Sequence, residues 1–267
     1  MPNQPVNKSI YQSICNRKKV SAVAYNNKED KDNAQTDFPF VSIIVCTMRQ
    51  SCIKNIFDNY SRQIYKNKEM IIVLNNNNMK LSGWQEKADM YRNVKVFQVD
   101  EKITLGNCMN FGISQSNHEI IAKFDDDDYY GPKYLLDSIK EFQQYDADIV
   151  GKAASFVYFK KSKILAIRFP YNENRYVFHM DGPTLLIKKR VFEKIRFADI
   201  PRGIDTQFSK DCVKNGFKIY SINRFHHVYI RDESSNNHTW KISDKNLLRW
   251  CKIIRRGVDD YTKFADI

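Results

Sequence analysis

Glycine and proline are scarce in this sequence, with 9 Gly and 7 Pro among 267 residues. That scarcity excludes a collagen-like or low-complexity chain, and a hydrophobic fraction of 42% excludes wholesale disorder. No apolar run approaches the roughly 20 residues that a membrane-spanning helix needs; the stretch Phe40–Cys46 has only the length of a strand. Met1–Ser13 is polar and lacks the apolar segment of a secretory signal. We therefore expect a soluble protein.

Several short motifs are also missing. The six cysteines form no Cys-x-x-Cys pair, which excludes a zinc knuckle and a thioredoxin-type redox site. Three disulfides are formally possible, but a chain of this length does not need them, and a reducing, cytoplasmic compartment is favoured. The absence of a Gly-x-x-x-x-Gly-Lys loop argues against an ATPase or kinase. The absence of Gly-x-Ser-x-Gly argues against a serine hydrolase.

Positive charge is in excess. Lys and Arg number 43 against 31 Asp and Glu, which leaves a net charge of +12. Such a surplus favours an anionic partner, for example an anionic polymer, a phosphorylated substrate or a membrane surface, although a solvated basic surface explains it equally well. No zinc-finger spacing and no glycine-aromatic RNA-binding motif accompanies the charge, so nucleic acid is not the expected partner.

The pattern of apolar residues divides the chain. Asn26–Asn33 shows no apolar period, and residues 1–37 predict a flexible N-terminal arm, while residues 38–267 predict a single α/β domain. In residues 38–150, buried strands alternate with helices, which is typical of a doubly wound, mostly parallel sheet with helices on both faces. The predicted strands are Phe40–Thr47, Met70–Leu74, Val94–Val99 and Glu119–Phe124, and the predicted helices are Ile53–Tyr65, Trp84–Tyr91, Leu105–Ser114 and Pro132–Gln144.

The second half of the domain has a different pattern. Gly151–Phe159 and Ile164–Phe169 predict an antiparallel hairpin around a polar turn. Residues 151–243 form the second part of the predicted domain. Residues 244–267 predict a C-terminal helix, because the apolar residues of Asp244–Arg255 recur at helical spacing.

Four consecutive aspartates, Asp125–Asp128, follow the predicted strand Glu119–Phe124 directly. Ligands of open α/β sheets bind beyond the carboxyl ends of the strands. Asp125 and Asp127 are two residues apart and can converge there on one hard cation, Mg²⁺ or Mn²⁺, which takes oxygen ligands and shares them with a diphosphate. A solvated acidic turn is the alternative interpretation.

Other stretches occur in the same order as in a known family. They are the strand Val41–Thr47 followed by Arg49, the helix segment Asn110–Ile113, the acidic run followed by Pro132, and Gly203–Phe208. Over roughly residues 40–241 the chain resembles the family 2 glycosyltransferases, which have the GT-A fold. Within that family it is most similar to the spore maturation protein CgeD group, through Asn59–Gln63, the acidic run with Tyr129–Tyr130, Gly151–Lys152 and His238–Trp240.

The resemblance implies an inverting, metal-dependent, hexosyltransferase-like enzyme. Residues 38–150 would bind a nucleotide-diphosphate sugar donor, and residues 151–243 a glycan, lipid-linked or protein acceptor at a cell or spore surface. Asp205 would be the catalytic base, and Asp127, Asp125 and His238 would hold Mn²⁺ or Mg²⁺; alternatively, His238 only packs beside Trp240. The residues expected to bind the donor are Thr47, Arg49, Asn75, Asn76, Asn110, Asp125, Asp126 and Lys152.

Two departures from the family pattern keep a second interpretation open. The turn after the second strand has Asn75 and Asn76 where the family usually has an acidic pair, and Ile204 precedes Asp205 where the family commonly has Glu. An asparagine can bond a base edge but carries no charge. A non-catalytic protein that binds sugar nucleotides or glycans in an assembly, and has kept the fold, is therefore the alternative.

Overall fold

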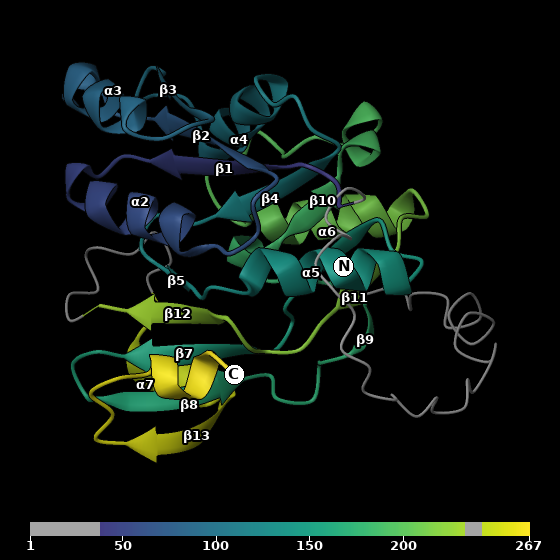
Figure 1. Ribbon diagram of the computed structural model, residues 1–267. Helices are drawn as coiled ribbons and strands as arrows, with labels where there is room; N and C mark the ends of the chain where they lie inside the picture. The colour runs from purple at the N-terminus through teal and green to yellow at the C-terminus, as the bar shows by residue number, and fades with distance from the viewer. Residues whose placement is uncertain (1–37, 233–241) are drawn as a thin grey trace, which may run out of the picture. The chain divides into compact units, whose positions relative to one another are not determined.

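The computed structural model describes residues 38–232 and 242–267. The predicted arm, residues 1–37, lies outside the described residues, as do His238 and Trp240. The described chain forms two sheets (Figure 1). Among the described residues, no helix combines the length and the apolar character needed to cross a bilayer.

The first sheet has eight described strands in the order β3-β2-β1-β4-β10-β6-β11-β9. In that order they span Val94–Gln98, Lys68–Leu74, Val41–Thr47, Ile120–Phe124, Leu186–Lys188, Ile149–Gly151, Ile219–Ser221 and Arg175–Val177. Strands β3, β2, β1 and β4 are parallel, whereas β10 runs antiparallel to both β4 and β6. The α/β prediction is confirmed, with a mixed sheet.

Helices cover both faces of this sheet because its central strands are apolar on both sides. In β1, Ile43 faces one core and Ile44 the other. The first core is shared with α2 (Ile53–Arg62), α3 (Leu81–Asp89) and α5 (Tyr134–Gln144). The second is shared with α4 (Leu105–Ser114) and α6 (Ile204–Lys214).

Short 3₁₀ turns complete the connections of this first sheet. They are η1 (Gln50–Cys52), η2 (Gly182–Thr184) and η3 (Lys189–Glu193). The turn η1 follows β1, and η2 lies between β9 and β10.

The second sheet has five described strands in the order β13-β8-β7-β12-β5. They span Cys251–Arg256, Ile164–Arg168, Ser155–Phe159, His227–Arg231 and Tyr129–Tyr130. The predicted hairpin is confirmed as β7 and β8, which pair antiparallel. Strand β5 follows the acidic run and pairs with β12, so the run joins the two sheets. One face of this sheet carries α7 (Asp244–Leu248), and the other carries α8 (Thr262–Ala265).

Two predictions about this half are wrong. Gly151–Phe159 is not one strand, because the chain leaves the first sheet after β6 and enters the second at β7. At the break, the Lys152 amide donates to the Thr184 hydroxyl (2.9 Å) and the Ala153 amide to the Ser221 hydroxyl (2.9 Å). The tail is not one helix over Asp244–Arg255, because α7 stops at Leu248 and β13 then pairs with the open edge of β8.

Candidate active site

The four aspartates after β4 alternate between buried and accessible. Asp126 and Asp128 are buried, whereas the side chains of Asp125 and Asp127 are 35% and 24% exposed. The run lies in a bend between β4 and the next strand. Asp125 and Asp127 are the two accessible carboxylates of the run.

Asp128 holds the two sheets together. The Ile230 amide of β12 donates to its Oδ1 (3.0 Å), and His227 Nε2 lies 3.3 Å from its Oδ2. Burial raises the pKa of Asp128 well above its usual value and lowers the pKa of His227 well below its own. Both shifts favour the neutral forms, so the pair is a buried hydrogen bond and Asp128 is structural.

Asp126 connects the acidic run to the end of β1. Its carboxylate accepts hydrogen bonds from the Thr47 hydroxyl (2.5 Å) and from Arg49 Nε (3.1 Å), and it forms an ion pair with the same guanidinium. Arg49 also reaches Asp127, with 3.0 Å between Nη2 and Oδ2. The structure thus brings Thr47, Arg49 and the acids together, but Asp126 is occupied by protein donors and positions the loop.

A buried lysine, which the sequence analysis did not single out, lies beneath the acids. Lys123 of β4 has a 3% exposed side chain, and its Nζ is 2.5 Å from Asp125 Oδ1. Burial alone would lower the pKa of Lys123, but Asp125 and Asp205 raise it above its usual value. A charged residue within the apolar run Ile120–Phe124 was the available signal, because an ionised side chain is seldom buried without partners.

Asp205 lies in the first turn of α6, after Gly203, whose φ is +76°. Its carboxylate packs against Gly182, where an added Cβ would lie 2.0 Å from Asp205 Oδ2. Asp205 Oδ1 is buried and has no hydrogen-bond partner. Burial raises the pKa of Asp205, and the neighbouring Lys123 partly opposes that rise. Asp205 is therefore protonated more easily than an ordinary aspartate, and one of its oxygens is buried without a partner.

The asparagine turn after β2 lies beside the end of β1. Asn75 donates from its side chain to the Asp100 carbonyl (2.8 Å), and Asn76 to the Met48 carbonyl (3.1 Å). Next to this turn is a pocket of about 570 Å³. It is lined by Met48, Gln50, Asn76, Asn78, Met79, Lys80, Ser82, Gly83 and Glu86. The pocket lies at the carboxyl ends of two parallel strands, where such sheets bind ligands.

Two predicted donor-binding residues do not reach the acids. Lys152 is buried, its Nζ donates to the Asn223 carbonyl (2.7 Å), and burial lowers its pKa to about 7. Asn110 uses both ends of its amide on the backbone of Phe197, at 2.8 and 3.0 Å. Both residues therefore stabilise the fold around the site, because their polar groups are already taken by main-chain partners.

A sequence profile described as Glycosyl transferase family 2 matches residues 42–198. The chain belongs to this family. The match contains the end of β1, the asparagine turn and all four aspartates, and it ends before Asp205. No curated protein matches the chain.

Solved glycosyltransferases share the fold. S. aureus TarS 1-349 in complex with UDP-GlcNAc is similar with a TM-score of 0.62 and 16% identity, over 79% of this chain and 64% of that one. The mannosyltransferase PcManGT from Pyrobaculum calidifontis, in complex with GDP-Man and Mn2+, is similar with a TM-score of 0.58 and 16% identity, over 79% and 62%. The chain spans less than two thirds of the length of these glycosyltransferases.

The described residues suit a metal ion only if a bound ligand, such as a diphosphate, supplies the remaining oxygen atoms around it. Among residues 38–232 and 242–267, no three His, Cys, Asp or Glu side chains come together as a metal site. Asp125 and Asp127 are the accessible oxygen donors, and each is also paired with a protein cation. Mg²⁺ is usually held by one or two carboxylates plus substrate phosphates, and the aspartates after β4 fit that arrangement.

Proposed function

We propose that this family 2 member is an inverting glycosyltransferase that moves a sugar from a nucleoside-diphosphate donor to an acceptor hydroxyl. The observation that carries the proposal is Asp205, a carboxylate with a raised pKa and a buried, unpartnered oxygen. Electrostatic coupling of Asp205 to Lys123 and Asp125 ties it to the acidic run. A general base needs this combination of position and basicity.

In the proposed reaction, Asp205 accepts the proton of the acceptor hydroxyl as that oxygen bonds to the anomeric carbon. The bond from that carbon to the donor phosphate breaks on the opposite side, and its electron pair leaves with the nucleoside diphosphate. The configuration of the anomeric carbon is therefore inverted. Burial helps the base, because it destabilises the ionised carboxylate and so favours proton uptake.

Asp125 and Asp127 are the residues that would hold a divalent metal, Mn²⁺ or Mg²⁺, with the donor diphosphate. When bound, the metal supplies positive charge that stabilises the leaving diphosphate. The PcManGT structure contains Mn2+ with GDP-Man, which supports this assignment. The proposed third ligand, His238, lies outside the described residues. Arg49 adds positive charge beside the same carboxylates.

The nucleoside is proposed to bind in the 570 Å³ pocket beside Asn76. This pocket adjoins the segment Thr47–Arg49, which contacts the acidic run, so a nucleotide there would direct its phosphates toward Asp127. UDP-GlcNAc in TarS and GDP-Man in PcManGT support a nucleotide-sugar donor. A hexose donor fits the same class of chemistry.

The acceptor is proposed to be a glycan of a cell surface or spore coat, free, lipid-linked or on a protein. This part rests on the likeness to the spore maturation protein CgeD group and on the net charge of +12. A cytoplasmic protein that contacts a membrane or spore surface peripherally would meet such an acceptor.

A specific observation favours a second candidate. Ile204, where the family commonly has Glu, is buried in the core between α4 and α6. No carboxylate from that position can therefore support Asp205. A protein that binds nucleotide sugars or glycans without transferring the sugar is the alternative.

Replacing the proposed base tests the assignment. Asp205→Asn should retain binding of UDP or GDP in the presence of Mn²⁺ and lower sugar transfer by about 10²–10⁴-fold, the usual contribution of a general base. Calorimetry measures the binding, and release of nucleotide measures the reaction with a panel of UDP- and GDP-sugars. Donor binding without nucleotide release in the wild-type protein would instead support the non-catalytic alternative.

A further inference from the structure

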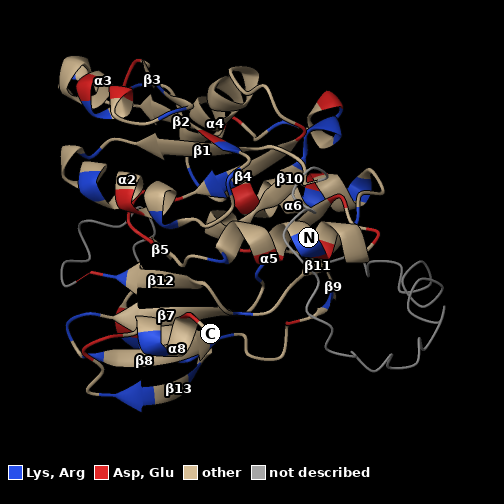
Figure 2. Cartoon of the chain, viewed as in Figure 1, with Lys and Arg blue, Asp and Glu red and all other residues tan. Residues whose placement is uncertain are grey.

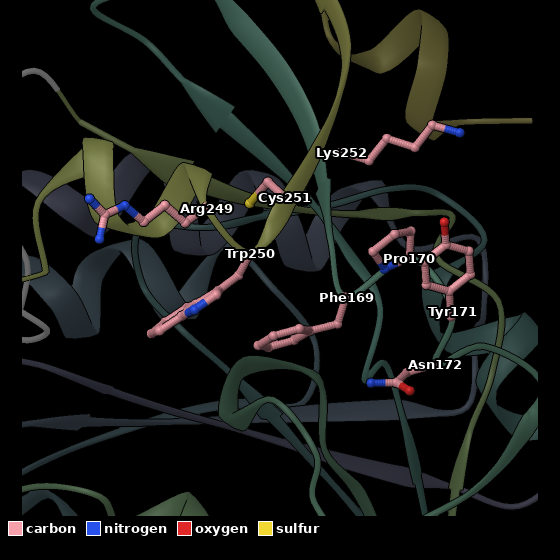
Figure 3. Close-up of a pocket in the computed structure, with 8 residues that line it drawn as sticks. All are labelled: Phe169, Pro170, Tyr171, Asn172, Arg249, Trp250, Cys251 and Lys252. Carbon is pink, nitrogen blue, oxygen red and sulfur yellow. The ribbon is translucent and has the colours of Figure 1, made fainter.

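A second pocket lies in the other sheet, beside the ends of β8 and β13. Its volume is about 380 Å³. It is lined by Phe169, Pro170, Tyr171, Asn172, Arg249, Trp250, Cys251 and Lys252 (Figure 3). None of these residues belongs to the candidate active site, so the pocket needs an explanation of its own.

Exposed aromatic rings form the pocket. Phe169, Trp250 and Tyr171 are 38%, 46% and 85% exposed. The rings of Phe169 and Trp250 lie side by side (Figure 3), with centroids 6.1 Å apart and planes 24° from parallel. Neighbouring exposed aromatic residues mark a ligand surface, because water solvates them poorly. Two nearly parallel rings suit a flat, partly apolar ligand such as the C–H face of a sugar.

The backbone holds the Phe169 ring in place. Phe169 has a φ of +49°, in the left-handed region that bulky residues avoid. Its amide donates to the Trp250 carbonyl (3.1 Å), and its carbonyl accepts from the Asn172 amide (3.1 Å). Strained backbone of this kind concentrates at ligand sites, where the surroundings enforce it. The two rings are therefore placed by main-chain contacts.

Two basic residues, Arg249 and Lys252, also line the pocket. Both are exposed, and their side chains extend away from the two rings (Figure 3). Strand β13 continues with Arg255 and Arg256, so it carries a stretch of basic residues (Figure 2). Exposed guanidinium and ammonium groups at a pocket favour a ligand that carries carboxylate or phosphate.

A chain of contacts connects this pocket to Asp205. The Arg168 guanidinium lies 5.6 Å from the Phe169 ring and forms an ion pair with Asp181. Asp181 precedes Gly182, the residue against which the Asp205 carboxylate packs. The aromatic pocket therefore connects to the base, whereas the nucleoside pocket adjoins the ends of β1 and β2.

We infer that this pocket is a subsite for an anionic oligosaccharide acceptor. One sugar ring of the acceptor lies on Phe169 and Trp250, and an acidic group on the glycan pairs with Arg249 or Lys252. The inference rests on the proposed function, because sugar transfer to an acceptor explains why the protein would bind a glycan. It deepens that function by naming the acceptor class and the surface that selects it.

The test measures binding of acidic trisaccharides to the full chain by calorimetry. The probes are trigalacturonate and a phosphorylated maltotriose, each compared with its neutral form, the methyl ester or the dephosphorylated sugar. At least one acidic probe should bind at least tenfold more tightly than its neutral form, and the better one identifies the acidic group. Trp250→Ala should weaken that binding by at least tenfold, and Arg249→Gln with Lys252→Gln should remove the preference for charge.

Matched controls separate stacking from general effects. Phe40→Ala removes an equally exposed ring, 46%, from the start of β1, and Lys140→Gln removes an exposed cation from α5. Neither should change the affinity. The inference is overturned if no probe binds saturably, or if Trp250→Ala binds as the wild type does, which would indicate adsorption by charge alone.

Nucleotide release without an acceptor distinguishes the two proposals. The Trp250→Ala variant should still release nucleotide, because its donor site is intact, but it should no longer bind the trisaccharide. If the protein binds the trisaccharide but neither binds nor cleaves any donor, the proposed function is wrong and the inference about the pocket is still supported. If the protein cleaves the donor but binds no probe, only the inference about the pocket is wrong.

Discussion

At the scale of single residues, buried and accessible side chains alternate along the acidic run. Asp126 and Asp128 are buried and bonded to Thr47 and Ile230, so they fix the loop. The accessible pair, Asp125 and Asp127, forms ion pairs with Lys123 and Arg49 and is the pair proposed to meet a ligand. Lys123 supplies the cation that makes several carboxylates tolerable in one place, because unpaired buried charge is costly.

Lys123 also lowers the pKa of Asp205, the proposed base, which leads to a prediction about pH. Because burial raises the pKa of Asp205, the acid limb of the transfer rate should lie above the ordinary aspartate range. Lys123 lowers that pKa, so Lys123→Met should move the limb to still higher pH. Initial rates against pH measure the shift. The exposed substitution Lys140→Met should leave the limb unchanged, and a limb that Lys123→Met does not move would contradict the coupling.

At the scale of elements, the turn η2 and the first turn of α6 form one contact. Gly182 has no side chain, and Asp205 fills the space that a Cβ would need. The left-handed Gly203 starts α6 so that residue 205 falls in its first turn. The position of the Asp205 carboxylate therefore depends on two glycines, Gly182 and Gly203, since each permits an arrangement that a larger residue would disturb.

Gly182→Ala should displace the Asp205 carboxylate and reduce transfer by about 10–100-fold, a loss typical of misplaced catalytic groups. Donor binding with Mn²⁺ should persist, because the acidic run is not altered. The decisive comparison is a double-mutant cycle of kcat. In the Asp205→Asn background, Gly182→Ala should have little further effect, and full additivity of the two losses would show that Gly182 acts elsewhere.

At the scale of the whole molecule, the described residues form four apolar clusters. The first sheet is covered by helices on both faces, and the second has its own apolar clusters under α7 and α8. The net charge of +12 is a property of the whole chain, and it favours association with anionic partners.

Deletion of residues 1–36 should therefore leave a cooperatively folded domain. We expect Tm to change by less than about 2 °C, which for a domain of this size corresponds to less than about 1 kcal/mol. Thermal unfolding followed by circular dichroism measures this directly. A much lower Tm would show that residues 1–36 contribute to the core of the domain.

The sequence by itself determined the α/β class, the four parallel strands β1 to β4 of the first sheet and the acidic run at the end of β4. These features are local: continuous apolar runs predict buried strands, and a strand's end determines where the following residues lie. Helix α4 agrees with its prediction at both ends, Leu105 and Ser114. Of the predicted site residues, Thr47, Arg49 and Asp125–Asp127 come together.

Only the tertiary structure decided the rest, because those features depend on partners far away in the sequence. The tail has apolar residues at helical spacing, yet the open edge of β8 offers hydrogen bonds that make Cys251–Arg256 a strand. Lys152 turned out to be a buried donor to Asn223, and Lys123 became a partner of two carboxylates. The contacts of Lys152 with Asn223 and of Lys123 with Asp205 join residues far apart in the sequence, so they are properties of the folded chain.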